Sequence, residues 1–330
     1  KDVPTTNVFA GYITYCAQRG IISGYGDGTF RPTGTLTGNA FMKMLLGALG
    51  YDSSIEGYTG SNWQVNVTKQ AIGIGLDDGN DEFVGSQAVT RQEAALYSFN
   101  MLQATMVEYD SKTTVNVNGA TVTIAGDKAQ DKSWGTGTNN DGNIDKDGFV
   151  QFAEQYFGDL RRIDGEDDFA RPSNVWRLRG TEIGTYAKEA DATYTAKVKA
   201  GDIYSDLNLG STIVPSDVEI YVNGVEKSTA PSVAIRRGSD DTVGVSANGV
   251  LTEVYYDEDA ETVTITQVLT YVGEVNRTVS ASSNRDAYVE VMTSVNGSNA
   301  PSGASGTEDF ETAESFDEES YVLYTFSEKE

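Results

Sequence analysis

The chain has 330 residues, with 49 acidic and 24 basic side chains and no histidine, so its formal net charge is −25. A field of this sign repels nucleic acid and anionic lipid, so we expect neither as a partner, and it attracts divalent cations. The lack of histidine excludes Ser-His-Asp and Cys-His catalysis and any zinc site with imidazole ligands.

Cysteine content and hydropathy bear on disulfide bonds, membrane spans and domain organisation. The single cysteine, Cys16, cannot form an intrachain disulfide, and its apolar neighbours predict a buried, unreactive thiol. No apolar run approaches the roughly 18 residues that a membrane span needs, so we expect none. Helix formers crowd the first third of the chain and Val, Thr and Tyr the last third, which indicates unlike domains in series.

The first part of the chain predicts two helices separated by turns. Apolar spacing predicts a helix over 9–19, and Gly20 ends it. Five glycines and a proline in 24–34 are typical of turns. Thr37 is the expected N-cap of the second helix, whose buried stripe is predicted to comprise Phe41, Met44, Leu45, Ala48 and Leu49.

A similar order of parts follows. We expect a helix over 63–74, an acidic glycine-rich loop over 75–85 and a helix running from Thr90 to about residue 106. Thr90 and Glu93 have the spacing of a capping box. An internal repeat of about 50–55 residues indicates stacked units that share a core, and we place them at 1–55 and 56–110.

The pattern changes over 111–172. Alternating residues on both sides of Asn118-Gly119 predict a hairpin. A polar loop is expected up to about residue 142, a helix over 149–160, and an acidic linker over 164–172.

From residue 173 to 330 the pattern is typical of β-structure, and such a domain can continue past 330. Asn223-Gly224 marks a hairpin turn after 217–222. Further strands are expected at 251–256, 262–268, 288–292 and 321–326, and mobile segments at 296–306 and 308–319. The predicted fold class is therefore α+β, with N-terminal helical repeats, a mixed segment and antiparallel, sandwich-like β domains.

The first repeat contains an ordered set of short motifs: Asp2-Val3-Pro4, Tyr12-Ile13, Gly20-Ile21-Ile22, Gly24-Tyr25, 27–32 and Leu36-Thr37. The second repeat keeps Gly73-Ile74-Gly75 and 89–94. In these residues the chain resembles the S-layer homology (SLH) module of bacterial cell-surface proteins, over about residues 1–110.

The resemblance implies non-covalent binding to secondary cell-wall polysaccharide. An acidic sugar needs an arginine fork, an aromatic platform and backbone donors. The matching positions are Tyr25, Asp27, Arg31 and Arg91, with Glu93 orienting the cap. Where the family has a T-R-A-E motif, this chain has Thr-Gly-Asn-Ala at 37–40, so a purely structural role for the repeats stays open.

Residues 143–154 fit the 12-residue calcium loop of an EF-hand. Such a loop takes oxygen ligands at positions 1, 3, 5, 7 and 12 and a glycine at position 6. The alternative is an acidic turn that caps the helix after it. The candidate ligands are Asn143, Asp145, Asp147, the carbonyl of Phe149 and Glu154.

We expect a secreted structural protein of the cell wall, S-layer or extracellular surface that self-assembles into an S-layer or filament, with 321–326 pairing with a neighbour's strand. The alternative is a polysaccharide-anchoring module carrying a cargo domain. Neither role is catalytic. The carboxylate clusters at 164–168, 257–259 and 308–319 are expected to be solvated turns, so we do not expect an enzyme.

Overall fold

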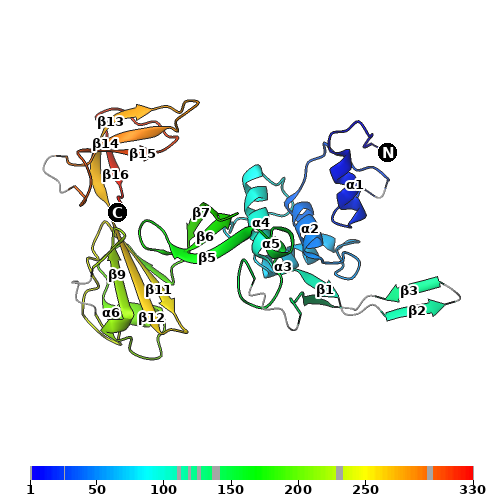
Figure 1. The fold of residues 1–330 in the computed structure, drawn as a ribbon, viewed down its shortest axis with the longest axis horizontal. Coiled ribbons are helices and arrows are strands. Elements are labelled where there is room, and N and C mark those ends of the chain that lie inside the picture. Colours follow the sequence, from blue (N-terminus) through cyan, green and yellow to red (C-terminus); the bar gives the residue numbers. More distant parts are fainter. Residues whose placement is uncertain are drawn as a thin grey trace. The chain divides into compact units, whose positions relative to one another are not determined.

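The computed structural model describes residues 2–25, 27–109, 113–117, 120–124, 128–135, 142–227, 233–295 and 300–329 (Figure 1). The chain forms two compact units. Unit 1 is Lys1–Arg162 with Arg177–Thr181, and unit 2 is Ile163–Trp176 with Glu182–Glu330. Helices dominate the start of unit 1 and antiparallel sheets dominate unit 2, so the predicted α+β class is confirmed.

Four helices build the N-terminal part of unit 1. Thr37 caps α2, its hydroxyl accepting a hydrogen bond from the Ala40 amide at 3.3 Å, and the predicted Thr90–Glu93 capping box is present at α4. The helices are α1 (Ala10–Gln18), α2 (Gly38–Leu49), α3 (Trp63–Gly73) and α4 (Arg91–Gln103).

The buried stripe of α2 differs from the predicted one. Met42 and Leu46 are fully buried together with Leu49, whereas Phe41, Met44 and Ala48 are half-buried. The buried face is shifted because α2 packs against both α3 and α4. The core that these helices share includes Val67, Ala71, Leu76 and Tyr97.

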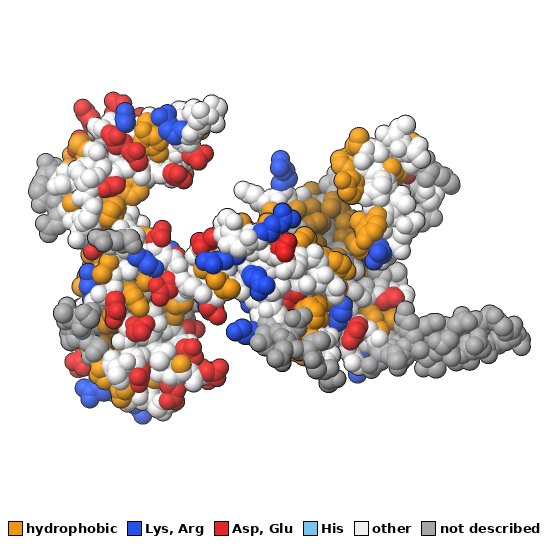
Figure 2. Space-filling model, viewed as in Figure 1, with side chains coloured by type: hydrophobic (Ala, Val, Ile, Leu, Met, Phe, Trp, Pro, Cys, Tyr) orange, Lys and Arg blue, Asp and Glu red, His pale blue; other side chains and the backbone are white. Residues whose placement is uncertain are grey.

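Helix α1 has no buried residue. The expectation of a buried Cys16 is wrong, because the thiol is half-buried. Figure 2 shows hydrophobic side chains on the surface of this part of unit 1, where Phe9 is 60% exposed and Tyr12 73% exposed.

Backbone pairing joins the two helical repeats. The Val89 amide donates to the Leu36 carbonyl at 2.9 Å, and the Asn39 amide donates to the Gly85 carbonyl at 2.8 Å. The buried Asn39 side chain accepts a hydrogen bond from the Thr68 hydroxyl at 2.8 Å. Gly38 lies so close to the second repeat that an added Cβ would stand 2.9 Å from the ring of Phe83.

Short strands follow the helices. β1 (Val107–Tyr109) pairs with β4 (Ala129–Asp131), and β2 (Thr113–Val117) pairs with β3 (Ala120–Ile124), which confirms the predicted hairpin. The turn residues 118–119 lie outside the described residues.

The predicted helix over 149–160 is largely wrong. Only α5 (Phe152–Tyr156) is helical. Val150 is held extended because its amide donates to the Lys132 carbonyl and its carbonyl accepts from the Met106 amide, both at 2.8 Å. At the other end, Leu160 begins a strand.

The segment expected to be an acidic linker belongs to a three-stranded sheet, ordered β5-β6-β7. A turn joins the first two strands: the Asp167 carboxylate accepts hydrogen bonds from the Arg171 amide at 2.9 Å and from Arg171 Nε at 2.6 Å. Residues 164–172 are therefore ordered by their own side chains. The strands are β5 (Leu160–Glu166), β6 (Pro172–Leu178) and β7 (Thr181–Ala187).

Unit 2 contains a five-stranded sheet ordered β10-β9-β12-β11-β8. All its pairs are antiparallel except β9 with β12. Asn223 and Gly224 both have positive φ, as a two-residue hairpin turn requires. The elements are β8 (Ala192–Tyr194), α6 (Ala200–Asp206), a 3-10 helix (Pro215–Asp217), β9 (Val218–Val222), β10 (Val225–Glu226), β11 (Val250–Asp257) and β12 (Thr262–Leu269).

A second sheet of unit 2 is antiparallel, ordered β15-β14-β13-β16. Part of the acidic segment expected to be mobile is strand β15, because Phe310 packs 5.4 Å from the ring of Tyr324 and supplies an apolar face. The strands are β13 (Tyr271–Val279), β14 (Tyr288–Met292), β15 (Thr307–Glu311) and β16 (Tyr321–Tyr324).

Candidate functional site

A cavity of about 520 Å³ opens in unit 1 between the turn-rich segment after α1 and the helices α2 and α3. Three aromatic side chains, Phe30 among them, and two cationic side chains lie in its wall. We call it the aromatic–cation pocket and define it by Tyr25, Arg31, Lys43 and Trp63.

Each cation of the pocket lies over an aromatic ring. The guanidinium carbon of Arg31 is 4.0 Å from the centre of the Tyr25 ring, and Lys43 Nζ is 5.5 Å from the centre of the Trp63 ring. Lys43 also donates a hydrogen bond to the Tyr58 carbonyl at 2.7 Å. Both pairs are cation–π contacts that fix the charge against a flat apolar surface.

Two carboxylates shape the loop that carries Arg31. Asp2 accepts hydrogen bonds from the amides of Phe30 at 2.7 Å and Arg31 at 2.6 Å, and these bonds lower the pKa of Asp2. Asp27 accepts from the hydroxyl and the amide of Thr29 and pairs with Arg31 Nη2 at 2.9 Å. The same contacts lower the pKa of Asp27 to about 2. Arg31 is thereby held with a φ of 57°.

The pocket presents an exposed aromatic face and an ammonium group on the same wall. The Tyr25 side chain is 49% exposed and offers a ring face at the rim. Burial lowers the pKa of Lys43, and among the described residues no carboxylate forms an ion pair with its ammonium. The ammonium group of Lys43 is therefore available in the pocket wall for an anionic group, since no described carboxylate pairs with it.

The structure brings together only some of the residues predicted to bind polysaccharide. Tyr25 and Arg31 line the pocket, and Asp27 supports Arg31. Arg91 and Glu93 lie at the start of α4, outside this lining, and Glu93 accepts a hydrogen bond from the Thr90 amide at 2.7 Å.

Lys43 and Trp63 are pocket residues that the sequence prediction missed. Ala40 and Lys43 share one face of α2, three residues apart, and both line the cavity. This spacing after the Thr37 cap was a usable signal for Lys43. Trp63, at the first turn of α3, had none, because its place depends on how the two helices pack.

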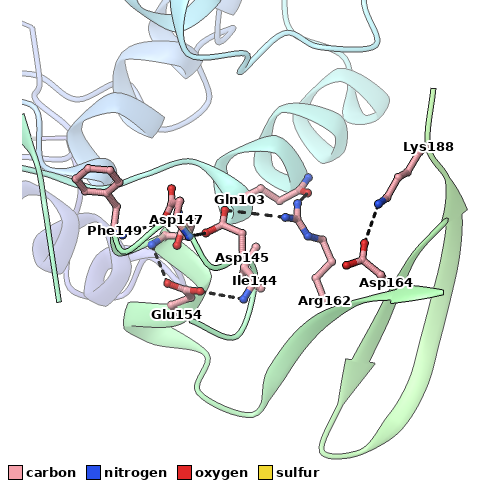
Figure 3. A network of polar contacts seen from close by, with 10 residues as sticks. Gln103, Ile144, Asp145, Asp147, Phe149, Glu154, Arg162, Asp164 and Lys188 are labelled. Atoms are coloured by element: carbon pink, nitrogen blue, oxygen red, sulfur yellow. Dashed lines mark hydrogen bonds and ion pairs between the residues drawn. The ribbon is translucent and has the colours of Figure 1, made fainter. Parts of the chain in front are cut away.

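The loop 143–154 is closed around Glu154, which is 7% exposed (Figure 3). Its Oε1 accepts a hydrogen bond from the Ile144 amide at 2.9 Å, and its Oε2 accepts from the Gln151 amide at 3.1 Å. Asp147 Oδ1 accepts from the Phe149 amide at 2.8 Å. The capping role expected as the alternative to calcium binding is thus visible in the geometry.

The other candidate ligands surround this cap. Asp145 Oδ1 accepts from the Asp147 amide at 3.4 Å, and burial together with the Asp147 carboxylate raises the pKa of Asp145 to about 6. Asn143 Nδ2 donates to the Gly158 carbonyl at 3.2 Å. Within the described ranges no three His, Cys, Asp or Glu side chains already stand close enough to hold a metal ion.

A third feature lies beside the second sheet of unit 2. A cavity of about 630 Å³ is lined by apolar side chains of β14, β15 and β16. On the edge strand β16, Leu323 is 73% and Tyr321 60% exposed.

Residues 1–41 match the S-layer homology domain. Neither the curated proteins nor the solved structures contain a match to the chain. The matched segment includes the whole loop that carries Tyr25 and Arg31, so the chain contains an SLH domain, and such a domain indicates a surface protein associated with the cell wall. No helix in the described part of the chain is long and apolar enough to cross a membrane.

Proposed function

We propose that this chain is a bacterial surface protein held at the cell wall by an acidic polysaccharide bound in the aromatic–cation pocket. The observation that carries the proposal is the pair of cation–π contacts, Arg31 on Tyr25 and Lys43 on Trp63, in the wall of one cavity. The match of residues 1–41 to the SLH domain supports the same role.

Charge decides which polysaccharides fit. The whole chain carries −25, which opposes an anionic glycan at long range. Within about 8–10 Å, the Debye length at physiological salt, local charges dominate, and there the glycan meets Lys43 together with Arg31, whose charge is partly balanced by Asp27. We therefore infer short-range recognition of single acidic sugars, with ring faces packed on the aromatic side chains.

A sedimentation assay on purified wall sacculi tests this function. The full chain is mixed with sacculi that retain their polysaccharide and with sacculi stripped of it. Tyr25→Ala and Lys43→Met are compared with Tyr12→Ala, which removes an exposed tyrosine outside the pocket. The proposal expects binding that depends on the polysaccharide and is weakened only by the two pocket variants. Equal sedimentation of all four proteins, or equal binding to stripped sacculi, contradicts it.

Self-assembly is a second candidate function, and the exposed apolar edge of the second sheet favours it. Strands β15 and β16 are the two edges of this sheet. Pairing β16 of one copy with β15 of the next would continue the sheet from molecule to molecule, since the two edges differ and the contact does not close. Electron microscopy of the purified protein at high concentration tests this, and monodisperse particles throughout would contradict it.

A further inference from the structure

The calcium-loop segment contains a buried polar atom that the cap does not explain. Gln151 is 1% exposed, and its Nε2 donates a hydrogen bond to Asp147 Oδ2 at 3.0 Å. Its Oε1 has no hydrogen-bond partner among the described residues. A buried amide oxygen without a partner is costly, so a group that would complete it is expected at this point.

The amide of Gln151 is directed at the acidic loop. Its Nε2 donates to the Asp147 carboxylate, so the buried amide group belongs to the same segment as Asp145 and Glu154. Arg162 Nη2 is 3.9 Å from Asp145 Oδ2, but Arg162 Nη1 donates to Gln103 Oε1 at 2.8 Å (Figure 3). The three carboxylates of the loop face two cations, Lys146 within it and Arg162 beside it, which leaves one net negative charge.

We propose that residues 143–154 form a Ca²⁺ site in which Gln151 Oε1 is a ligand in addition to the oxygens that the sequence pattern identifies. Gln151 stands at position 9 of the 12-residue loop, a position that contributes to coordination in such loops. Ca²⁺ takes six to eight oxygen ligands at variable angles, and every candidate donor here is an oxygen. The candidates are Asn143, Asp145, Asp147, the Phe149 carbonyl, Gln151 and Glu154.

Two anchors hold the loop in place for the ion. Ile144 is 2% exposed, and Val150 is bonded through its backbone to Lys132 and Met106. The residues between these anchors keep their short-range bonds to Asp145 and Asp147. Because the ends of this stretch are fixed to the core of unit 1, binding has to order few residues.

Ca²⁺ has to compete with the backbone hydrogen bonds that Glu154 accepts in capping α5. Both oxygens of Glu154 accept backbone hydrogen bonds, from Ile144 and Gln151. Binding through Glu154 therefore exchanges one or both of these bonds for the cation. This competition predicts weak affinity, on the order of 10⁻⁴ to 10⁻³ M, as in extracellular calcium modules.

Isothermal titration of CaCl₂ into the chelator-treated full chain tests the proposal. Gln151→Met keeps the length of the side chain and removes the amide oxygen, and we expect it to weaken binding at least tenfold. Gln151→Glu restores an oxygen and adds charge, and it should bind at least as tightly as the native chain. Asp159→Asn is the matched control, because this exposed carboxylate pairs with Arg179 outside the loop.

A second readout is independent of stability. The Trp134 amide donates to the Gly148 carbonyl, so this tryptophan lies beside the loop and should sensitise Tb³⁺ luminescence that Ca²⁺ displaces. The site would be overturned if the native protein, folded by its circular dichroism spectrum, released no heat of Ca²⁺ binding in the titration and showed no Tb³⁺ luminescence that Ca²⁺ displaces. Binding by Gln151→Met equal to that of the native chain would overturn the role of Gln151. Glu154→Gln should abolish binding, and unchanged binding would also overturn the site.

Discussion

The guanidinium carbon of Arg31 lies 4.0 Å above the Tyr25 ring, while the amide of the same arginine donates a hydrogen bond to Asp2 at 2.6 Å. One residue therefore joins the N-terminal segment to the wall of the aromatic–cation pocket. Its left-handed backbone is held by Asp2, and its side chain is held by Asp27 and Tyr25. The pocket therefore depends on hydrogen bonds between Asp2 and two residues, Phe30 and Arg31, that lie 28 and 29 residues further along the sequence.

Asp2 should thus affect binding without lining the cavity. In Asp2→Asn the carboxylate that accepts hydrogen bonds from the amides of Phe30 and Arg31 becomes a neutral amide. These hydrogen bonds should weaken, and the loop that carries Arg31 should become more mobile. We expect faster amide hydrogen exchange over residues 28–32 and weaker polysaccharide binding, with exchange in α4 unchanged. Native-like exchange at the Phe30 and Arg31 amides would show that Asp2 is not the support.

The carboxyl of Asp27 should titrate far below its usual range. Its pKa falls from 3.8 to about 2 through the hydrogen bonds of Thr29 and the contact with Arg31. Because the folded state favours the ionised form, the contribution of Asp27 to stability is complete above about pH 4 and is lost as the pH falls through about 2. A carbon-13 NMR titration of this carboxyl measures it. In Thr29→Ala the midpoint should rise, and a native midpoint near 3.8 would contradict the geometry.

Gly38 should be intolerant of a side chain. A Cβ there would lie 2.9 Å from the Phe83 ring and 3.2 Å from Gly85 Cα, so Gly38→Ala should destabilise unit 1 by about 1–3 kcal/mol. Gly73→Ala is the control, because a Cβ at Gly73 meets no atom within 4 Å. Chemical denaturation compares the two. Equal free energies of unfolding for Gly38→Ala and the native chain would show that the repeats do not pack as described.

The edge strand β16 should control association if the second candidate function holds. Leu323→Lys places a charge on the exposed edge, which discourages strand pairing. We expect assemblies seen by light scattering to shrink to monomers. Val65→Lys adds the same charge on an exposed position of α3, and it should leave assembly unchanged.

The sequence predicted local structure well where one segment carries its own signal. The Thr37 and Thr90 caps and the hairpin at Asn223-Gly224 are confirmed. Predictions failed where distant partners decide: Val150 is extended because of Met106 and Lys132, not because of its neighbours in sequence. Strand β15 forms in an acidic segment because the Phe310 ring packs against the Tyr324 ring, which lies on another strand.

The same distinction applies to the pocket. Tyr25 and Arg31 belong to a recognisable motif, and the structure places both in the wall of one cavity. Lys43 lies on the cavity face of α2 at a spacing after the Thr37 cap that the sequence contains, whereas Trp63 reaches the cavity through the packing of α2 against α3, which no short motif encodes. Gly38 and Asn39, where the family motif is absent, instead contact the second repeat.

The most direct test of the anchoring proposal is the affinity of the full chain for purified acidic wall polysaccharide, measured by calorimetry at two salt concentrations. Lys43→Met removes the charge and keeps the apolar stem, and Arg91→Ala removes an arginine outside the pocket. We predict that native binding weakens with salt, that Lys43→Met binds about tenfold less tightly with a smaller salt dependence, and that Arg91→Ala binds as the native chain does. Native affinity and salt dependence in Lys43→Met would contradict the account.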